Sequence, residues 1–257
     1  MSDIKFGDTI AVWFSCGAAS AVAAKMTVQR YGERCLIRVL NNPIAEEDDD
    51  NRRFLNDVQA WLGIPVEIVT SKRYPSNSAV DVWEKRKFMS GPMGAPCTVE
   101  LKKYARQDWE KQNHVDWHVL GFTSDERTRH DRFVIAERSN VIPVLISENI
   151  TKADCYAILQ TAGIKLPRIY SLGYPNANCI GCVKATSATY WSHVRSVHPD
   201  IFASRSEQSR RLGARLVRHR GKRMFLDELP DGATGKPIKS MDIECGLFCE
   251  ERNPKKI

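Results

Sequence analysis

The segment Thr9-Ile-Ala-Val-Trp-Phe-Ser-Cys-Gly-Ala-Ala-Ser20 joins a short apolar run to a turn of small residues. Thr9 to Phe14 has the composition of a buried strand, and the alanine-rich stretch that continues through Tyr31 has that of a helix. The segment therefore predicts a strand, a tight turn and a helix in succession, which is the first unit of an α/β fold.

The same alternation continues through the amino-terminal half of the chain. Strands separated by helices of this length favour a mostly parallel sheet that is covered on both faces. We therefore predict an α/β fold with a doubly wound, mostly parallel, Rossmann-like sheet. Further strands are expected at Cys35–Leu40, Val66–Thr70, Trp117–Gly121 and Val141–Ile146, and helices at Asp48–Leu62, Ala79–Phe88 and Thr98–Gln112.

The character of the chain changes after Thr151, which is expected to cap a helix over Lys152–Thr161. We expect a nucleotide-binding α/β domain over residues 1–165, and a cysteine-containing, basic, largely helical region over residues 166–257 that packs on it. The second region begins with a stretch rich in Pro, Gly and Asn. Helices are predicted there at Thr189–Val197 and Ile201–Leu212, followed by a hairpin of Arg215–Arg218 with Arg223–Leu226.

The composition indicates a cytoplasmic protein. With 257 residues the chain can bury a sizeable core. Met1 to Asp8 is polar and charged, and no apolar run approaches the roughly 20 residues of a membrane-spanning helix, so no membrane partner is expected. In a reducing cytoplasm the eight cysteines are expected to be thiols or metal ligands rather than disulfides.

The formal net charge of +7 indicates a polyanionic partner, such as a nucleotide or a nucleic acid. Much of this charge lies between Arg205 and Arg223, where acidic residues are almost absent. The segment predicts either contact with nucleic acid or a solvated face of a helix and a strand. Its basic residues are Arg205, Arg210, Arg211, Arg215, Arg218, Arg220, Lys222 and Arg223.

Cysteines recur at Cys97, in the turn Cys179-Ile-Gly-Cys182, and in the tail Glu244-Cys245-Gly-Leu-Phe-Cys249. Thiols spaced in this way suit a metal site assembled by folding better than a disulfide framework. We expect a [4Fe-4S] cluster held by Cys97, Cys179 and Cys182, with Cys249 as the best fourth ligand and Cys245 as the next candidate. Zinc, which four thiolates satisfy equally, and a metal-free redox pair remain alternatives.

The turn from Ser15 to Ser20 lies where α/β folds bind ligands, after a strand and before a helix. Its small residues Gly17, Ala18 and Ala19 let the backbone approach an anion closely, and the two serines add hydroxyl groups. The turn matches neither standard glycine-rich nucleotide motif, and any tight strand-to-helix turn favours small residues.

These segments together resemble the phosphoadenosine phosphosulfate (PAPS) reductase family of adenine nucleotide alpha-hydrolase-like, or PP-loop, proteins. Phe14–Ser20 is similar to the pyrophosphate-binding loop of that superfamily, and Gly121–Arg129 is similar to the family's Gly-x-Arg-x-x-Glu-x-x-x-Arg region. The two cysteine segments of the family resemble Cys97 with its following lysines, and the turn from Cys179 to Cys182. The likeness covers nearly the whole chain.

The most specific match is the tail Glu244-Cys245-Gly-Leu, because the family's tail thiol attacks sulfur. The resemblance implies that Cys245 attacks the sulfonate of an adenine sulfonucleotide, and that a thioredoxin-like reductant then releases sulfite. It implies a nucleotide site formed by Ser15, Cys16, Gly17, Ala18, Ser20, Glu126 and Arg129. Lys102, Lys103 and Arg127 would contact the anionic groups of the substrate.

The chain departs from the family pattern in three places. Ala19 stands where the common loop has Asp, and Cys97 stands alone where iron-sulfur members have a Cys-Cys pair. The basic segment is also outside the ordinary reductase pattern. The alternative function is therefore an ATP-dependent, iron-sulfur-assisted sulfur transferase that modifies tRNA or DNA, and a third is a non-enzymatic, redox-sensing protein that binds nucleic acid.

Overall fold

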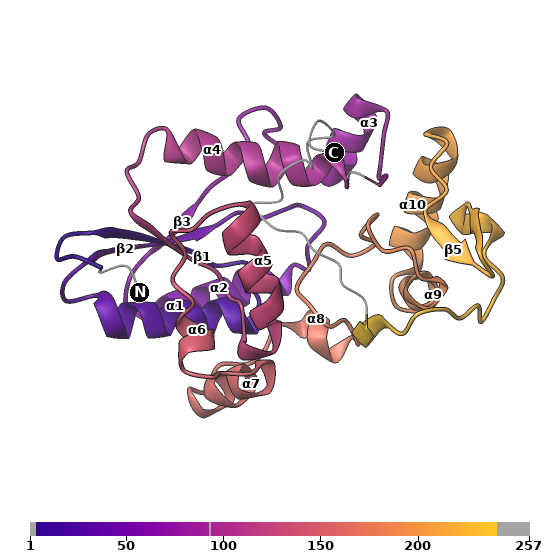
Figure 1. Ribbon diagram of the computed structural model, residues 1–257. Helices are drawn as coiled ribbons and strands as arrows, with labels where there is room; N and C mark the ends of the chain where they lie inside the picture. The colour runs from indigo at the N-terminus through magenta and orange to yellow at the C-terminus, as the bar shows by residue number, and fades with distance from the viewer. Residues whose placement is uncertain (1–3, 93, 241–257) are drawn as a thin grey trace. The chain divides into compact units, whose positions relative to one another are not determined.

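The computed structural model describes residues 4–92 and 94–240, which form two compact units (Figure 1). Unit 1 contains residues 4–43, 49–69 and 106–171, and unit 2 contains residues 44–48, 70–92, 94–105 and 172–240. The predicted tail residues Cys245 and Cys249 lie outside the described residues.

Unit 1 is built on a parallel sheet of four strands in the order β3-β2-β1-β4. In this sheet Val12 is paired with Val39 on one side and with Val119 on the other. The mostly parallel α/β fold expected from the sequence is therefore confirmed. The strands are β1 (Thr9–Trp13), β2 (Leu36–Asn41), β3 (Val66–Ile68) and β4 (Trp117–Val119).

Both faces of this sheet are covered by helices, as Figure 1 shows. On one face Ile10 and Val12 are buried against α1 (Ala18–Tyr31), whose alanines allow a close approach of helix to sheet. On the other face the ring of Trp13 packs edge-on against Trp109 of α4 (Tyr104–Glu110), with centroids 5.8 Å apart. Alternate side chains of one strand thus fill two apolar layers.

The elements predicted for unit 1 are present with one exception, whereas the helices at Ser124–Glu126, Arg127–Ala136 and Arg168–Ser171 were not predicted. The predicted cap at Thr151 is present, because its hydroxyl accepts a hydrogen bond from Asp154 N. The remaining elements of unit 1 are α2 (Asp50–Leu62), η2 (Ser124–Glu126), α5 (Arg127–Ala136), α6 (Val144–Ser147), α7 (Lys152–Thr161) and α8 (Arg168–Ser171).

The exception is the strand predicted at Val141–Ile146, which is wrong. Only Val141 extends the sheet, through a single parallel bridge to His118. Pro143 lacks an N–H group and precedes a short helix from Val144 to Ser147, so the ladder cannot continue.

Unit 2 is mainly helical and packs around aromatic residues. Trp191 contacts Tyr190 and Phe202 with ring centroids 5.3 and 6.4 Å apart. The predicted hairpin is present, although its turn has two residues rather than four. The elements are α3 (Ala79–Arg86), the π-helix η1 (Thr98–Lys103), α9 (Ala188–Val197), α10 (Pro199–Arg211), β5 (Val217–His219), β6 (Lys222–Met224), η3 (Leu226–Glu228) and η4 (Ile238–Ser240).

The two units differ from the contiguous domains expected at residues 1–165 and 166–257. Residues 70–92 and 94–105 join the carboxyl-terminal residues because α3 and the segment before it pack there: Glu84 of α3 accepts a hydrogen bond from Gln208 of α10. Among the described residues, no helix combines the length and the apolar character that crossing a membrane requires.

Candidate nucleotide loop and cysteine turn

The loop between β1 and α1 is closed by its two serines. Ser20 Oγ donates a hydrogen bond to Gly17 O at 2.9 Å, accepts one from Ser15 N at 3.2 Å, and lies 3.2 Å from Ser15 Oγ. The amino terminus of α1 lies at the loop and has no side-chain cap from Gly17, while its first N–H group, that of Ala18, donates to the hydroxyl of Tyr170. This arrangement suits the binding of an anion.

Cys16 occupies the tightest point of the loop. Its φ of 55° is left-handed, a conformation that non-glycine residues rarely adopt outside functional turns. Its side chain is buried, and Asn41 Nδ2 donates to Phe14 O at 2.8 Å and lies 3.4 Å from Cys16 Sγ. Cys16 therefore shapes the loop through its backbone, while its thiol belongs to the core.

The segment Gly121–Arg129 begins against this loop. A Cβ atom on Gly121 would lie 2.7 Å from Ser20 N, so only glycine allows the two backbones to meet. Farther along, Glu126 accepts hydrogen bonds from Thr123 N and pairs with Arg129, and Arg127 donates to Ile146 O at 3.3 Å. The structure thus places the start of the predicted segment at the loop, and its charged residues bond within unit 1.

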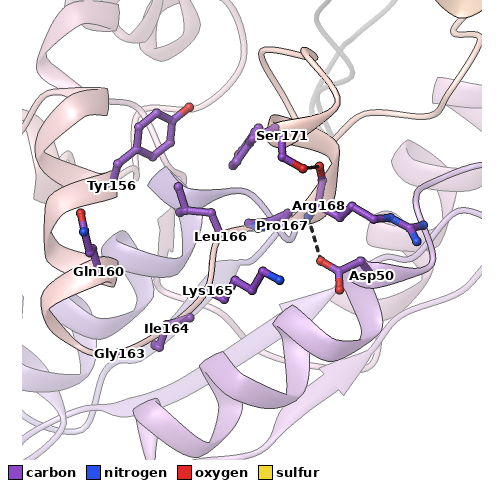
Figure 2. Close-up of a pocket in the computed structure, with 11 residues that line it drawn as sticks. Asp50, Tyr156, Gln160, Gly163, Ile164, Lys165, Leu166, Pro167, Arg168 and Ser171 are labelled. Atoms are coloured by element: carbon purple, nitrogen blue, oxygen red, sulfur yellow. Dashed lines mark hydrogen bonds between the residues drawn. The ribbon is translucent and has the colours of Figure 1, made fainter. Parts of the chain in front are cut away.

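A cavity of about 740 Å³ lies in unit 1, lined by residues of α2, α7 and the segment from 163 to 171. Figure 2 shows its wall, including Tyr156, Lys165 and the hydrogen bond from Arg168 N to Asp50 Oδ2 at 2.8 Å. Hydrogen bonds from Arg53 are the main reason that the pKa of Asp50 falls to about 2, so this carboxylate is charged at neutral pH.

Tyr170 connects the cavity to the loop. It lines the cavity, and its hydroxyl accepts a hydrogen bond from Ala18 N at 3.2 Å. Burial raises the pKa of this hydroxyl, so it stays protonated. From the sequence Tyr170 is expected only to be a core residue, because a tyrosine in a loop carries no signal of contact with a turn so distant along the chain.

The Cys179–Cys182 turn lies in unit 2 and is held by hydrogen bonds to its backbone. Cys182 N donates to the hydroxyl of Tyr190 at 2.9 Å, and Ile180 N donates to Glu46 O at 2.9 Å. Gly181 adopts a left-handed φ of 68° between them. Cys182 is buried, whereas Cys179 is half-buried.

A buried guanidinium lies against this turn. Arg205 of α10 is only 3% exposed, stacks over the ring of Trp83 at 4.4 Å, and donates to Gln208 Oε1 at 2.6 Å. A Cβ atom on Gly181 would lie 3.7 Å from Arg205 Nε, and this Nε–H has no hydrogen-bond partner among the described residues. Burial lowers the pKa of Arg205, and the neighbouring Glu46 opposes this shift.

The burial of Arg205 corrects the expectation that it belongs to an exposed or nucleic-acid-binding face. A signal for this burial is present in the sequence. Phe202, Arg205, Ser206 and Ser209 recur at helical spacing, and all four are buried. Because the second of these positions is an arginine, a search for apolar residues at helical spacing does not detect this buried face.

Cys97 immediately precedes the π-helix η1, an uncommon element that often marks functional sites. On that helix Lys102 is buried, and its Nζ lies 3.6 Å from Glu47 Oε1, whereas Lys103 is half-buried. The predicted anion contact of Lys102 therefore competes with an ion pair inside unit 2.

The described residues contain no group of three or more His, Cys, Asp or Glu side chains arranged to hold a metal ion. Cys179 and Cys182 share one turn, with an unpartnered, buried N–H donor beside it. This donor set fits an iron-sulfur cluster in kind, because cluster sulfurs accept hydrogen bonds.

Neither protein-family models nor curated proteins match the chain. Solved structures do. The U34-tRNA thiolase NcsA from Methanococcus maripaludis, solved with its [4Fe-4S] cluster, is similar with 14% identity and a TM-score of 0.50 over 96% of this chain and 84% of that chain. The phosphoadenylyl-sulfate (PAPS) reductase from Candida auris, in a phosphate complex, matches with 12% identity and a TM-score of 0.47 over 66% of this chain and 80% of that one.

At such identities a structural likeness concerns the fold. The thiolase match extends over almost the whole of this chain, and it agrees with the parallel sheet and flanking helices seen here.

Proposed function

We propose that this chain is an enzyme of the PP-loop superfamily, in its PAPS reductase-like branch, which binds an adenine nucleotide at the loop from Ser15 to Ser20. The observation that carries the proposal is the closure of this loop by its two serines at the amino terminus of α1. Small residues let the phosphates approach the backbone, and the helix terminus favours their negative charge.

The leading reaction is the reduction of an adenine sulfonucleotide. The Cys245 thiolate attacks the sulfonate sulfur, an S–S bond forms, and the S–O bond to the nucleotide phosphate breaks, so that the nucleotide phosphate leaves. A dithiol of the thioredoxin type then attacks the sulfur of Cys245 and releases sulfite. Its second thiol resolves the mixed disulfide, which returns Cys245 as a thiol and leaves the dithiol oxidised.

Cys97, Cys179, Cys182 and Cys249 would hold a [4Fe-4S] cluster in this proposal. Bound there, the cluster would supply a redox-active centre whose potential depends on hydrogen bonds to its sulfurs. The chain's own contribution is the turn, which is fixed through Tyr190 and Glu46. Arg127 and Arg129 would neutralise the phosphate and sulfonate groups, and Glu126 would orient Arg129.

The proposal is tested by adding PAPS or adenylyl sulfate with thioredoxin and measuring sulfite. Wild-type protein is expected to release sulfite, and Cys245→Ser is expected to release none while still binding the nucleotide. Ser20→Ala should weaken nucleotide binding about tenfold, because it opens the loop. Ser147→Ala is the matched control, since Ser147 Oγ also donates to a backbone carbonyl of unit 1.

Calorimetry measures the binding step separately from sulfite release. Equal nucleotide affinity in wild type and Ser20→Ala would contradict the assignment of the loop. Sulfite release that survives Cys245→Ser would contradict the assignment of the nucleophile.

The second candidate is an ATP-dependent sulfur transferase that acts on tRNA or DNA. Five exposed basic residues near the hairpin β5–β6 favour it, because the described residues give them no carboxylate partner. Ala19 in the loop counts against ATP cleavage assisted by a loop-bound magnesium ion. Mass spectrometry of nucleosides after incubation with ATP and a sulfur donor distinguishes the two candidates, since only the transferase forms a thiolated base.

A further inference from the structure

The structure divides the basic residues between Arg205 and Arg223 into two groups. Three of them are engaged within the protein: Arg205 is buried, and Arg210 and Arg211 form ion pairs with carboxylates. The other five side chains are exposed and make no ion pair within the described part of the chain, although Arg223 donates to Leu216 O at 3.1 Å and Arg215 lies over the ring of Phe225 at 5.4 Å. The five are Arg215, Arg218, Arg220, Lys222 and Arg223.

The five unpaired residues lie on or directly before the hairpin β5–β6, which we call the basic hairpin (residues 215–223). On its inner face Val217 is fully buried and stands opposite Met224, while the pair His219 and Lys222 follows on the same face toward the turn. Arg218 stands opposite Arg223 on the other face, and both are exposed. Side chains directly opposite in an antiparallel pair have Cβ atoms roughly 5 Å apart, so these like charges repel each other.

The turn of the basic hairpin concentrates the charge further. Arg220 and Gly221 have φ values of 47° and 79°, the left-handed pair that a two-residue hairpin turn requires. Arg220 adopts this conformation although it has a Cβ atom, and it places another cation at the tip. Repulsion across the strands and strain in the turn are both unfavourable for the isolated chain, and a bound polyanion would relieve the repulsion.

We propose that the basic hairpin docks on the phosphate backbone of a nucleic acid. Guanidinium groups bind phosphate oxygens with two parallel hydrogen bonds, and a two-stranded ribbon fits a nucleic-acid groove. A lipid surface fits less well, because it requires apolar side chains beside the charges. The nearest aromatic ring, that of Phe225, is covered by the guanidinium of Arg210 at 4.0 Å.

This inference goes beyond the proposed reductase and does not depend on it. The basic hairpin belongs to unit 2, whereas the nucleotide loop belongs to unit 1. Confirmation would favour the second candidate function, since a docked nucleic acid is a substrate that the reductase does not need.

The test is the binding of fluorescent tRNA and duplex DNA to the full-length protein over a range of salt concentrations, without added nucleotide. The double variant Arg218→Gln/Arg223→Gln is compared with Arg210→Gln/Arg211→Gln, which removes the same charge from residues paired with Asp227, Glu228 and Glu84. The hairpin variant should bind about tenfold more weakly. The slope of log K against the logarithm of the salt concentration should fall in magnitude by about two. The matched control should change affinity by no more than about twofold.

Arg220→Gly provides a second variant, because glycine suits the left-handed turn and the substitution removes one charge. It should keep the wild-type melting temperature and lower the salt slope by about one. Nucleotide affinity should be unchanged in all these variants, so a failure of the nucleotide loop would be seen separately. Equal losses in hairpin and control variants, no binding of either nucleic acid by the wild type, or tighter binding to phosphatidylserine vesicles would each overturn the proposal.

Discussion

Gly121 controls the shape of the loop from Ser15 to Ser20, because β4 delivers it against the first turn of α1. The nearest atoms to a Cβ at this position are Ser20 N, Ser20 Cα and Ala19 C, at 2.7, 2.9 and 3.0 Å. All three belong to the backbone, which cannot swing aside as a flexible side chain can. The close approach of the two segments therefore requires glycine at position 121.

Gly121→Ala is expected to displace the loop and to destabilise unit 1 by about 1–3 kcal/mol, the usual penalty of overpacking. Nucleotide affinity should fall in the same variant, since the displaced atoms include Ser20 N. Denaturant unfolding and calorimetry measure the two effects. A variant with wild-type stability and affinity would show that the loop does not depend on this contact.

The surroundings of Arg205 suit it to donate a hydrogen bond at the Cys179–Cys182 turn. Its guanidinium stacks on Trp83, its Nη1 is bonded to Gln208, and its Nε–H lies near Gly181 of the Cys179–Cys182 turn without a hydrogen-bond partner among the described residues. A buried, unpartnered donor is unfavourable unless a ligand accepts its hydrogen bond. Sulfur atoms of a cluster at this turn would do so.

Arg205→Met keeps an unbranched stem but removes the donor and the charge. A cluster held at this turn, as proposed, is expected to have a lower midpoint potential in this variant, because a cation and an N–H donor stabilise the reduced, more negative form. Electron paramagnetic resonance during a redox titration gives this potential. Arg210→Met is the control, since Arg210 pairs with Asp227 and Glu228 at the surface. Equal potentials in the two variants would rule out the hydrogen bond to sulfur.

Strand β4 is fastened to its neighbours by a buried polar network centred on His118. Both ring nitrogens of His118 face donors, with Trp13 Nε1 at 3.2 Å from Nδ1 and Arg138 Nη1 at 2.7 Å from Nε2. Glu110 of α4 accepts hydrogen bonds from Arg106 and Arg138, each at 2.7 Å. Burial, together with the charges of these arginines, lowers the pKa of His118 to about 3.

The low pKa of His118 makes stability depend on pH with a definite sign. In the unfolded chain a histidine binds its proton near pH 6.5, whereas the folded protein resists protonation down to about pH 3. The contribution of His118 to the free energy of unfolding is therefore complete above pH 6.5. It should fall by about 1.4 kcal/mol for each pH unit below that value. Urea unfolding of wild type and His118→Gln between pH 7 and 5 measures it.

The glutamine variant should be less stable than the wild type at pH 7, and the difference should shrink as the pH falls. Other acidic groups also titrate in this range, but they contribute equally to both proteins and cancel in the comparison. Parallel pH profiles for the two proteins would show that His118 does not oppose protonation.

Elements whose apolar residues follow a clear period were predictable. The strands from Thr9, Cys35, Val66 and Trp117 and the helix capped by Thr151 are all found near their predicted positions. The strand at Val141–Ile146 failed because Pro143 interrupts a run that is otherwise apolar and β-branched. A single residue without an N–H group outweighed the pattern around it.

At the scale of the whole molecule, the limits of sequence analysis follow from long-range contacts. The strand, turn and helix around Ser15 were predictable because their signals are local, whereas the burial of Arg205 depends on Trp83 and on the Cys179–Cys182 turn. The grouping of residues 70–92 and 94–105 with the carboxyl-terminal residues was not expected, because no change of composition marks it. Periodicity reports which face of an element is buried but not which distant segment covers it.

The cysteine site also belongs to this scale, because its proposed ligands come from segments far apart in the chain. Cys97, Cys179, Cys182 and Cys249 are each expected to lose bound iron when replaced by Ser, since serine is a poor ligand for a cluster held by thiolates. Cys245→Ser should keep iron and lose sulfite release, because its proposed task is attack on sulfur. Iron and sulfide analysis after anaerobic purification measures the first effect.

Cys35→Ser is the matched control for this series. Cys35 lies at the edge of unit 1, and its Sγ is 3.5 Å from Lys5 O, a contact that a serine hydroxyl can also make. This variant should keep the wild-type content of iron. Loss of iron in Cys245→Ser together with its retention in Cys249→Ser would exchange the roles of the two tail cysteines, because one tail thiol cannot serve as both ligand and nucleophile. Stoichiometric zinc in place of iron would assign the site to a structural metal.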